Sequence, residues 1–206
     1  MSSVRFKSVL LIGSLAVLSA CGGGGSSGVS AQYPLDTAVS AFYQMPESYK
    51  LSGTSGGNNF TLDLTITPGG QASFDGVQAM TAKTSSTETE NGVAAGSATA
   101  TEYFLTTPFT QIGALQNSGL AQVDSEQKPL PELAAAGDNG SLDTQKYYSD
   151  SSLGTQVATG TRSWTLTALT ADTAQFCISD TDDVGGPSET EIDCFDLDIK
   201  GNVSAI

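Results

Sequence analysis

Residues 60–67 read FTLDLTIT, and every second residue in this stretch is apolar. The period of two places Phe60, Leu62, Leu64 and Ile66 on one face of an extended chain and the polar residues on the other. One buried face and one solvated face are typical of a strand in an antiparallel sheet. This stretch therefore predicts a β fold, and Thr- and Gly-rich sequence continues on both sides of it.

Turn signals divide the surrounding chain into hairpins. Gly56-Gly57 precedes the strand, Pro68-Gly69-Gly70 predicts a turn after it, and Asn91-Gly92 suits a two-residue type I′ turn. Further strands are expected at residues 160–169, 174–179 and 192–200. Near the beginning, Asp36 is a good N-cap for a short helix that Pro46 ends. We expect an all-β fold: one antiparallel β-sandwich or curled, barrel-like sheet with a short N-terminal helix.

Residues 117–152 show no sustained period. A loop of this length in a compact domain is usually functional or mobile. One interpretation is a packed connection that crosses between strands. The other is an exposed contact surface at residues 129–148, which contain turn signals and the pair Tyr147-Tyr148.

The cysteines predict one disulfide and one modified residue. Cys177 and Cys194 form an even pair, whereas Cys21 follows an apolar leader. Alternation puts Cys177 opposite in direction to Phe176, and Cys194 opposite to Phe195, so both thiols face outward. We expect a disulfide across neighbouring strands. A zinc or copper site lacks ligands, because the chain has no histidine.

The sequence between the two cysteines contains an imperfect calcium-loop pattern. Asp180, Asp182 and Glu191 occupy positions one, three and twelve of such a loop, and Asp183 is a further oxygen donor. The fifth position holds Val184, where an oxygen ligand belongs. The competing interpretation is a solvated acidic hairpin loop.

The N-terminus has the order of a secretory signal peptide. Arg5 and Lys7 precede an apolar run at residues 9–18, which is shorter than the roughly 20 residues that span a bilayer. Residues 18–21, LSAC, resemble the lipobox of bacterial lipoproteins, whose cysteine becomes the acylated first residue. On this interpretation, residues 1–20 are the signal peptide, residues 21–32 contain the lipidated Cys21 and a Gly/Ser tether, and residues 33–206 form a single β domain. Gly22 favours export to the outer membrane.

Residues 49–54 (YKLSGT), 164–166 (WTL), 171–174 (ADTA) and 193–195 (DCF) are similar to segments of small, uncharacterised lipoproteins of Gram-negative bacteria. Those proteins combine a lipobox, a glycine tether and one Thr/Gly-rich β domain with a late cysteine pair. The resemblance implies location and fold, and it implies no catalytic residue.

Charge narrows the classes of function. Removing residues 1–20 takes away two of the eight basic residues and none of the 22 acidic ones, so the net charge goes from −14 to −16. Nucleic acid and anionic lipid both require a cationic face. A Ser-His-Asp triad is absent because histidine is absent. We expect a non-enzymatic envelope lipoprotein, held to the membrane through its N-terminal lipid, that binds an envelope protein or glycan; the alternative is a hydrolase that uses carboxylates.

Overall fold

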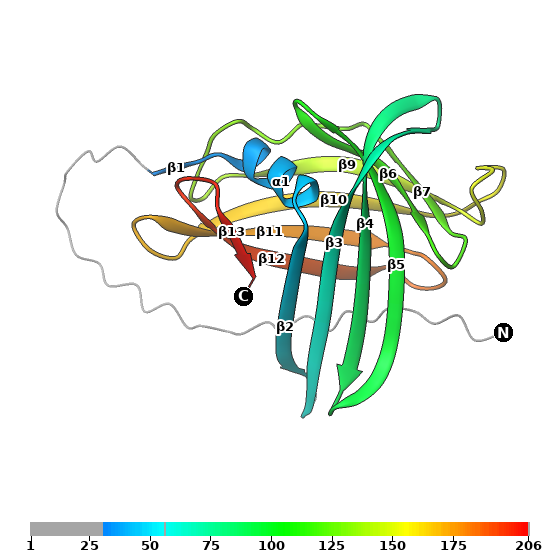
Figure 1. Cartoon of the computed structure of the whole chain (residues 1–206), viewed down its shortest axis with the longest axis horizontal. Helices are drawn as coiled ribbons and strands as arrows, with labels where there is room; N and C mark the ends of the chain where they lie inside the picture. Colours follow the sequence, from blue (N-terminus) through cyan, green and yellow to red (C-terminus); the bar gives the residue numbers. More distant parts are fainter. Residues whose placement is uncertain (1–30, 56, 206) are drawn as a thin grey trace.

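Eleven antiparallel strands form one continuous sheet in the computed structural model of the chain, which describes residues 31–55 and 57–205 (Figure 1). The order across the sheet is β13-β12-β11-β10-β9-β7-β6-β5-β4-β3-β2, and a separate ribbon pairs β1 with β8. The strands are β1 (Gln32–Tyr33), β2 (Glu47–Ser55), β3 (Asn58–Phe74), β4 (Val77–Glu90), β5 (Val93–Thr106), β6 (Phe109–Gln116), β7 (Ala121–Ser125), β8 (Ala134–Ala135), β9 (Asn139–Tyr148), β10 (Gln156–Ala168), β11 (Thr173–Asp182), β12 (Glu189–Asp198) and β13 (Val203–Ala205).

The sheet curls, so that β3, β4 and β5 cross the direction of β10, β11 and β12 (Figure 1). This confirms the expected all-β class and, of the two architectures, the curled sheet. A sandwich would require two facing sheets, whereas here the hydrogen-bonded order is unbroken from β13 to β2. The concave side of the curl holds the main apolar core, which includes Ile66, Phe104, Trp164, Leu166, Phe176 and Leu197.

Helix α1 (Leu35–Gln44) packs into this core through Leu35, Ala38 and Val39. Its ring of Phe42 lies 5.4 Å from that of Tyr49 on β2 and 5.0 Å from that of Phe195 on β12. The helix therefore bridges strands that lie near opposite edges of the sheet.

The predicted cap of this helix is wrong. The N-cap residue is Pro34, and it makes no side-chain capping bond. The carboxylate of Asp36 instead accepts a hydrogen bond of 2.6 Å from the backbone N–H of Phe109. Asp36 therefore bonds to a distant strand and does not cap its own helix, and this hydrogen bond connects α1 to β6.

The turn expected at Pro68-Gly69-Gly70 is also wrong, because β3 continues through it to Phe74 with a shift in register against β4. A Cβ atom on Gly69 would lie 2.2 Å from Oγ1 of Thr81, so the close approach of β4 requires glycine there. The hairpin turn falls later, at Asp75-Gly76, where φ is +46° and +76°. The turn predicted at Asn91-Gly92 is confirmed, with φ of +52° and +79°.

Strands β2 to β5 extend beyond the core as a four-stranded arm (Figure 1). Its outer face carries hydroxyl groups in register across the strands: Ser48, Thr65, Ser85 and Thr99 are successive partners. The hydroxyls of Ser85 and Thr99 lie 3.4 Å apart. On the inner face, Phe60, Leu62 and Leu64 remain partly exposed, unlike the buried Ile66 that follows them.

The irregular region at residues 117–152 contains β7, β8 and the central strand β9. Leu130 and Ala134 join the main core, and the N–H of Lys128 donates to the carbonyl of Leu142 at 2.7 Å. Residues 129–138 thus form a packed crossing, and Tyr147 is buried on β9. Leu130, Ala134 and Tyr147 are buried whereas Leu133 and residues 137–139 are exposed, so residues 129–148 are only partly an exposed surface, and their role as a contact surface stays a prediction.

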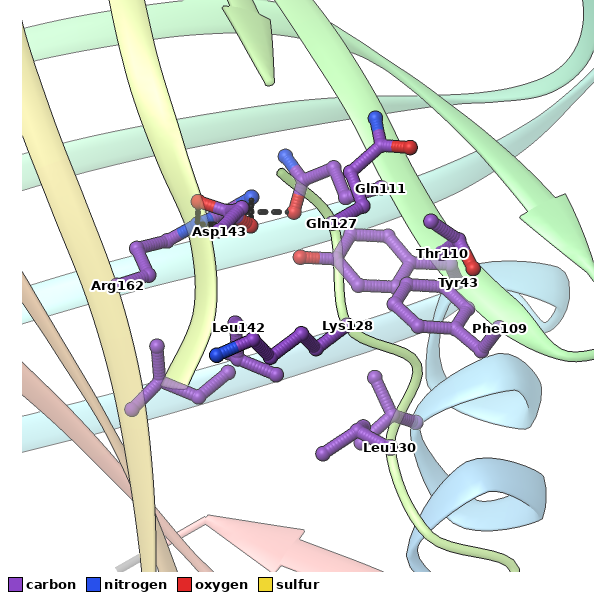
Figure 2. A pocket seen from close by; sticks show the side chains of 12 residues that line it. Tyr43, Phe109, Thr110, Gln111, Gln127, Lys128, Leu130, Leu142, Asp143 and Arg162 are labelled. Atoms are coloured by element: carbon purple, nitrogen blue, oxygen red, sulfur yellow. Dashed lines mark hydrogen bonds and ion pairs between the residues drawn. The ribbon is translucent and has the colours of Figure 1, made fainter. Parts of the chain in front are cut away.

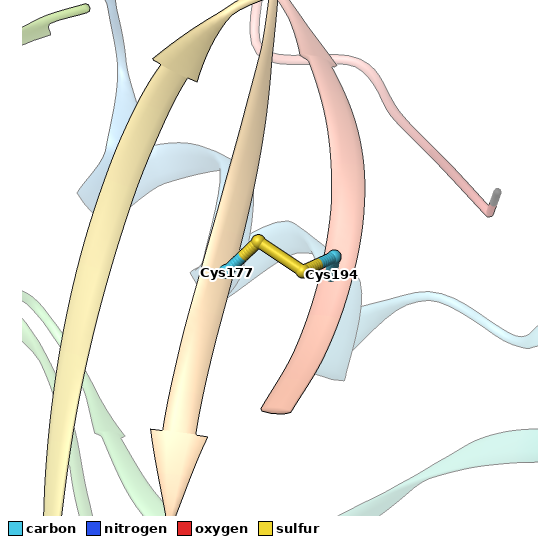
Figure 3. The surroundings of a disulfide bond; sticks show 2 residues. All are labelled: Cys177 and Cys194. Atoms are coloured by element: carbon cyan, nitrogen blue, oxygen red, sulfur yellow. A yellow bond between two sulfur atoms is a disulfide. The ribbon is translucent and has the colours of Figure 1, made fainter. Parts of the chain in front are cut away.

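Cys177 and Cys194 form a disulfide between β11 and β12 (Figure 3). The two residues are direct partners in the register, with Phe176 opposite Phe195 one step earlier on the inner face. This confirms the predicted pairing across neighbouring strands.

Within residues 31–55 and 57–205, no helix has the length and apolar character needed to cross a membrane.

Candidate functional site

A network of charged and amide side chains lies on the concave face, beside the apolar core. Its centre is Arg162, which β10 directs inward in the same alternation that buries Trp164 and Leu166. Arg162 is directly opposite Asp143 on β9 and Asp180 on β11. Asp124 comes from β7, where it pairs with Gln145 of β9. Polar side chains of the four neighbouring strands β7, β9, β10 and β11 therefore lie close together.

Every nitrogen of the Arg162 guanidinium has a partner. Nε donates to the two carboxylate oxygens of Asp143 at 3.0 and 3.1 Å, and Nη2 donates to Asp143 and, at 2.7 Å, to Asp124. Nη1 donates to Oε1 of Gln111 at 2.6 Å. Paired contacts between a guanidinium and a carboxylate are the strong form of this interaction. Burial disfavours the charged guanidinium, but Asp124 and Asp143 outweigh it and raise the pKa of Arg162 further.

Amides complete the network on both sides. The Nε2 atom of Gln122 donates to Asp124 at 2.7 Å. The fully buried Gln145 donates to Asp180 at 3.0 Å and accepts a hydrogen bond of 3.0 Å from the hydroxyl of Tyr147. These contacts supply most of the partners that buried polar groups require.

Glu102 holds its proton more tightly than an ordinary glutamate. Burial raises the pKa of Glu102 from 4.5 to about 7, against the opposing effect of Arg162. Its oxygens accept hydrogen bonds from Gln111 at 2.8 Å and from Thr84 at 3.3 Å. Glu102 is therefore partly protonated at neutral pH.

The pKa values of two aspartates are also raised. Burial raises the pKa of Asp180 to about 6, with Gln145 and Arg162 opposing the shift. The pKa of Asp193 also rises to about 6, because neighbouring protein removes water from its carboxyl group and because Asp180 lies nearby. Glu102 and Asp180, which surround Arg162, thus both have raised pKa values because of burial.

A small cavity of about 30 Å³ adjoins the network (Figure 2). Arg162 and Asp143 line one end of it, and Phe109 and Leu130 line the other. A water molecule needs about 10–15 Å³ measured in this way, so the cavity has room for roughly two. Burial and the nearby Glu102 raise the pKa of Tyr43, another lining residue, so its hydroxyl stays protonated and available as a donor.

This arrangement can hold protons and position small polar molecules. Its carboxyl groups with raised pKa values are suitable proton donors. The guanidinium is engaged by protein partners on all three nitrogens. The cavity beside it has room for roughly two water molecules.

The calcium loop expected at residues 180–191 is not formed. Asp180 and Asp182 lie in β11 and Glu191 lies in β12, directly opposite Asp180. Asp182 accepts from the N–H of Val184 at 2.8 Å, and Asp183 accepts from the N–H of Thr159 at 2.7 Å. Strand pairing has extended through the positions that a loop would use. Among the residues that the structure describes, no group of three or more His, Cys, Asp or Glu side chains is placed to hold a metal ion.

Cys21, the residue predicted to carry the lipid, lies outside the described residues. The Arg162 network was not anticipated, although one signal for it was present in the sequence. Arg162 has the same parity as Trp164 and Leu166, so the alternation that predicted this strand also placed a guanidinium on its inner face.

No protein-family model matches the sequence, and neither a curated protein nor a solved structure matches it.

Proposed function

We propose that this protein is an envelope lipoprotein, held on the outer membrane by a lipid on Cys21, that acts as a non-enzymatic binding module. The observation that carries the proposal is the sequence LSAC at residues 18–21, which ends an apolar run and is followed directly by four glycines. A cleaved signal peptide explains the two N-terminal cations and the short apolar run together.

Binding is supported over catalysis by the state of the polar centre. Arg162 is saturated by its own carboxylate and amide partners, and the adjoining cavity holds no more than about two waters. The outer face of the β2–β5 arm is the surface that we assign to a partner, because its hydroxyl groups are aligned across the strands. Ser48 and Thr65 are exposed, and Ser85 and Thr99 are half-buried. Such a face suits a partner held by hydrogen bonds, either an envelope protein or a glycan.

The lipid anchor is tested by Cys21→Ser, followed by membrane fractionation and mass spectrometry of the N-terminus. The variant should remain unprocessed or appear in the soluble fraction. The matched control replaces Cys177 and Cys194 together with serine, which also removes cysteines but leaves the anchor in place. Normal processing and membrane retention of Cys21→Ser would refute the anchor.

The binding role is tested by cross-linking the anchored protein in intact cells, with samples treated by protease or by glycosidase to separate protein from glycan partners. Thr65→Lys with Thr87→Lys should abolish capture, because both side chains lie on the outer face of the arm. Thr167→Lys on the outer face of β10 is the control. A hydrolase screen of the same protein addresses the alternative, and turnover abolished by Glu102→Gln would replace the binding proposal.

A further inference from the structure

Three turns meet at the end of the molecule where the described chain begins. They are the crossing around β8, the turn between β10 and β11, and the turn between β12 and β13. Figure 1 shows β1 at the same end as the last two of these turns. We call this region the β1 end, and it includes Gln32, Leu133, Leu169 and Ile199.

Hydrogen bonds hold the first two turns together. β1 pairs with β8, so that Gln32 faces Ala135 and Tyr33 faces Ala134, next to Leu133 in the sequence. The N–H of Gly137 then donates to the carbonyl of Leu166 at 2.7 Å. Leu133 and the end of β10 are therefore fixed around the beginning of β1.

The third turn closes the group. The N–H of Ile199 donates to the carbonyl of Asp172 at 3.1 Å, which joins the β12–β13 turn to the β10–β11 turn. A Cβ atom on Gly201 would lie 3.1 Å from Cγ of Pro34. Hence this turn also lies against the start of α1, one residue beyond β1.

Each of the three turns exposes one large apolar side chain. Leu133 is 57% exposed, Leu169 is 48% exposed and Ile199 is 43% exposed. Single exposed apolar residues are ordinary on a protein surface. Leu133, Leu169 and Ile199 differ from such single residues because all three lie at the β1 end. This is the end at which the described chain begins and from which the sequence leads back to Cys21.

The length of that connection limits how far the β1 end can lie from the lipid. Ala31 is ten positions after Cys21, and ten residue steps span at most about 33–36 Å when fully extended. A lipidated Cys21 therefore keeps the β1 end within about this distance of the bilayer.

We propose that the β1 end docks on the lipid surface that holds Cys21, with Leu133, Leu169 and Ile199 inserted among the headgroups. This inference rests on the lipid anchor proposed above. The β1 end also carries Glu132, Asp138, Asp172 and one cation, Lys200, so anionic lipid does not attract it. The contact is apolar, and it is expected on zwitterionic lipid and to be insensitive to salt.

The test uses the full acylated protein in phosphatidylcholine vesicles with brominated acyl chains, which quench a nearby fluorophore. Leu169→Cys and Ile199→Cys each provide one thiol for a bimane label, because Cys177 and Cys194 are bonded to each other and Cys21 is acylated. Val157→Cys is the matched control, since Val157 is 50% exposed and lies beside the β9–β10 turn at the opposite end (Figure 1).

Labels at positions 169 and 199 should lose at least twofold more fluorescence to the brominated lipid than the label at position 157. Equal quenching at all three positions, or none, overturns the docking while leaving the anchor intact if the protein still floats with the vesicles. Failure to float refutes the anchor and the docking together.

A second variant tests the apolar nature of the contact. With a label on Leu133→Cys, the added pair Leu169→Asp and Ile199→Asp should reduce quenching at least twofold, because it places two more carboxylates at the β1 end. Both replaced side chains are exposed, so the circular dichroism spectrum should not change. Undiminished quenching would refute insertion of these side chains.

Discussion

The β2–β5 arm and the β9–β12 part of the sheet are built from the same alternating pattern, but their inner faces differ. In β10, Trp164 and Leu166 are buried in the main apolar core, whereas Leu62 and Leu64 of β3 remain partly exposed. In β9, the inner positions hold Asp143, which contributes a charge to the Arg162 network. Alternation decides which side chains share a face, and the curl of the sheet decides whether that face is covered.

The largest effect is expected at the polar centre of the covered part. Arg162→Met leaves Asp124 and Asp143 enclosed without their cation, which should lower the free energy of unfolding by about 3–5 kcal/mol. Lys83→Met, on the exposed outer face of the arm, should change it by less than about 0.5 kcal/mol. Urea unfolding of the protein without residues 1–21 measures both. Equal effects would show that the two regions are not distinguished by burial.

The same comparison can be made with apolar residues. Leu166→Ala, at 1% exposure, should destabilise by about 2–5 kcal/mol because it leaves a cavity. Leu64→Ala in the arm should cost less than about 1.5 kcal/mol, since solvent already reaches that side chain. A cost at Leu64 as large as that at Leu166 would mean that another surface covers the inner face of the arm in solution.

Dependence on pH should separate the polar centre, to which β5 contributes Glu102, from the exposed outer face of the arm. Glu102 has a pKa of about 7 in the folded protein against 4.5 ordinarily, so its contribution to stability is fully present below pH 4.5 and is lost as the pH rises through 7. Asp180, with a pKa of about 6, acts in the same direction. Thermal unfolding between pH 5 and 8 should therefore show stability falling with pH, and Glu102→Gln should flatten the curve. Thr87→Gln in the arm is the control, and an identical slope in both variants would contradict the assignment.

The smallest effect is expected at the tip of the arm. Asn91 has φ of +52°, and its side chain accepts a hydrogen bond of 2.9 Å from the N–H of Asn59. Asn91→Ala should cost about 1 kcal/mol, because alanine tolerates this conformation poorly. The change should appear as faster amide hydrogen exchange in β4 and β5, with the β9–β12 part unaffected. Exchange that accelerates equally in both regions would show that the arm and the core unfold as one unit.

The sequence was informative wherever the inner face is apolar. The alternation at residues 60–67 and 160–169 predicted strands that the structure contains, and parity placed Cys177 and Cys194 on the outer face. The sequence did not predict β9. Its buried inner residues include Asp143 and Gln145, and polar side chains at inner positions hide the hydrophobic period. Of the four strands that build the polar centre, β7 and β9 were therefore not predicted, whereas β10 and β11 were.

Local turn signals succeeded only where nothing distant competed with them. Asn91-Gly92 forms its turn at the solvated end of the arm. Pro68-Gly69-Gly70 has the composition of a turn, but pairing with β4 continues past it, and the turn is made by Asp75-Gly76, a dipeptide equally suited to the purpose. Asp36 likewise does not cap its own helix and instead accepts a hydrogen bond from a residue on β6. None of these tertiary partners can be read from the neighbouring residues.

The order of strands across the sheet has a consequence for the sequence of events in which the chain folds. From β2 to β7 and from β9 to β13, each strand pairs with the one just before it, so each hairpin can close as soon as its second strand emerges. Contacts close in sequence are the ones that form fastest. The exception is β1, whose partner β8 lies about a hundred residues later. Strand β1 can therefore pair only after the middle of the chain is present, and it is among the last parts of the N-terminal half to become ordered.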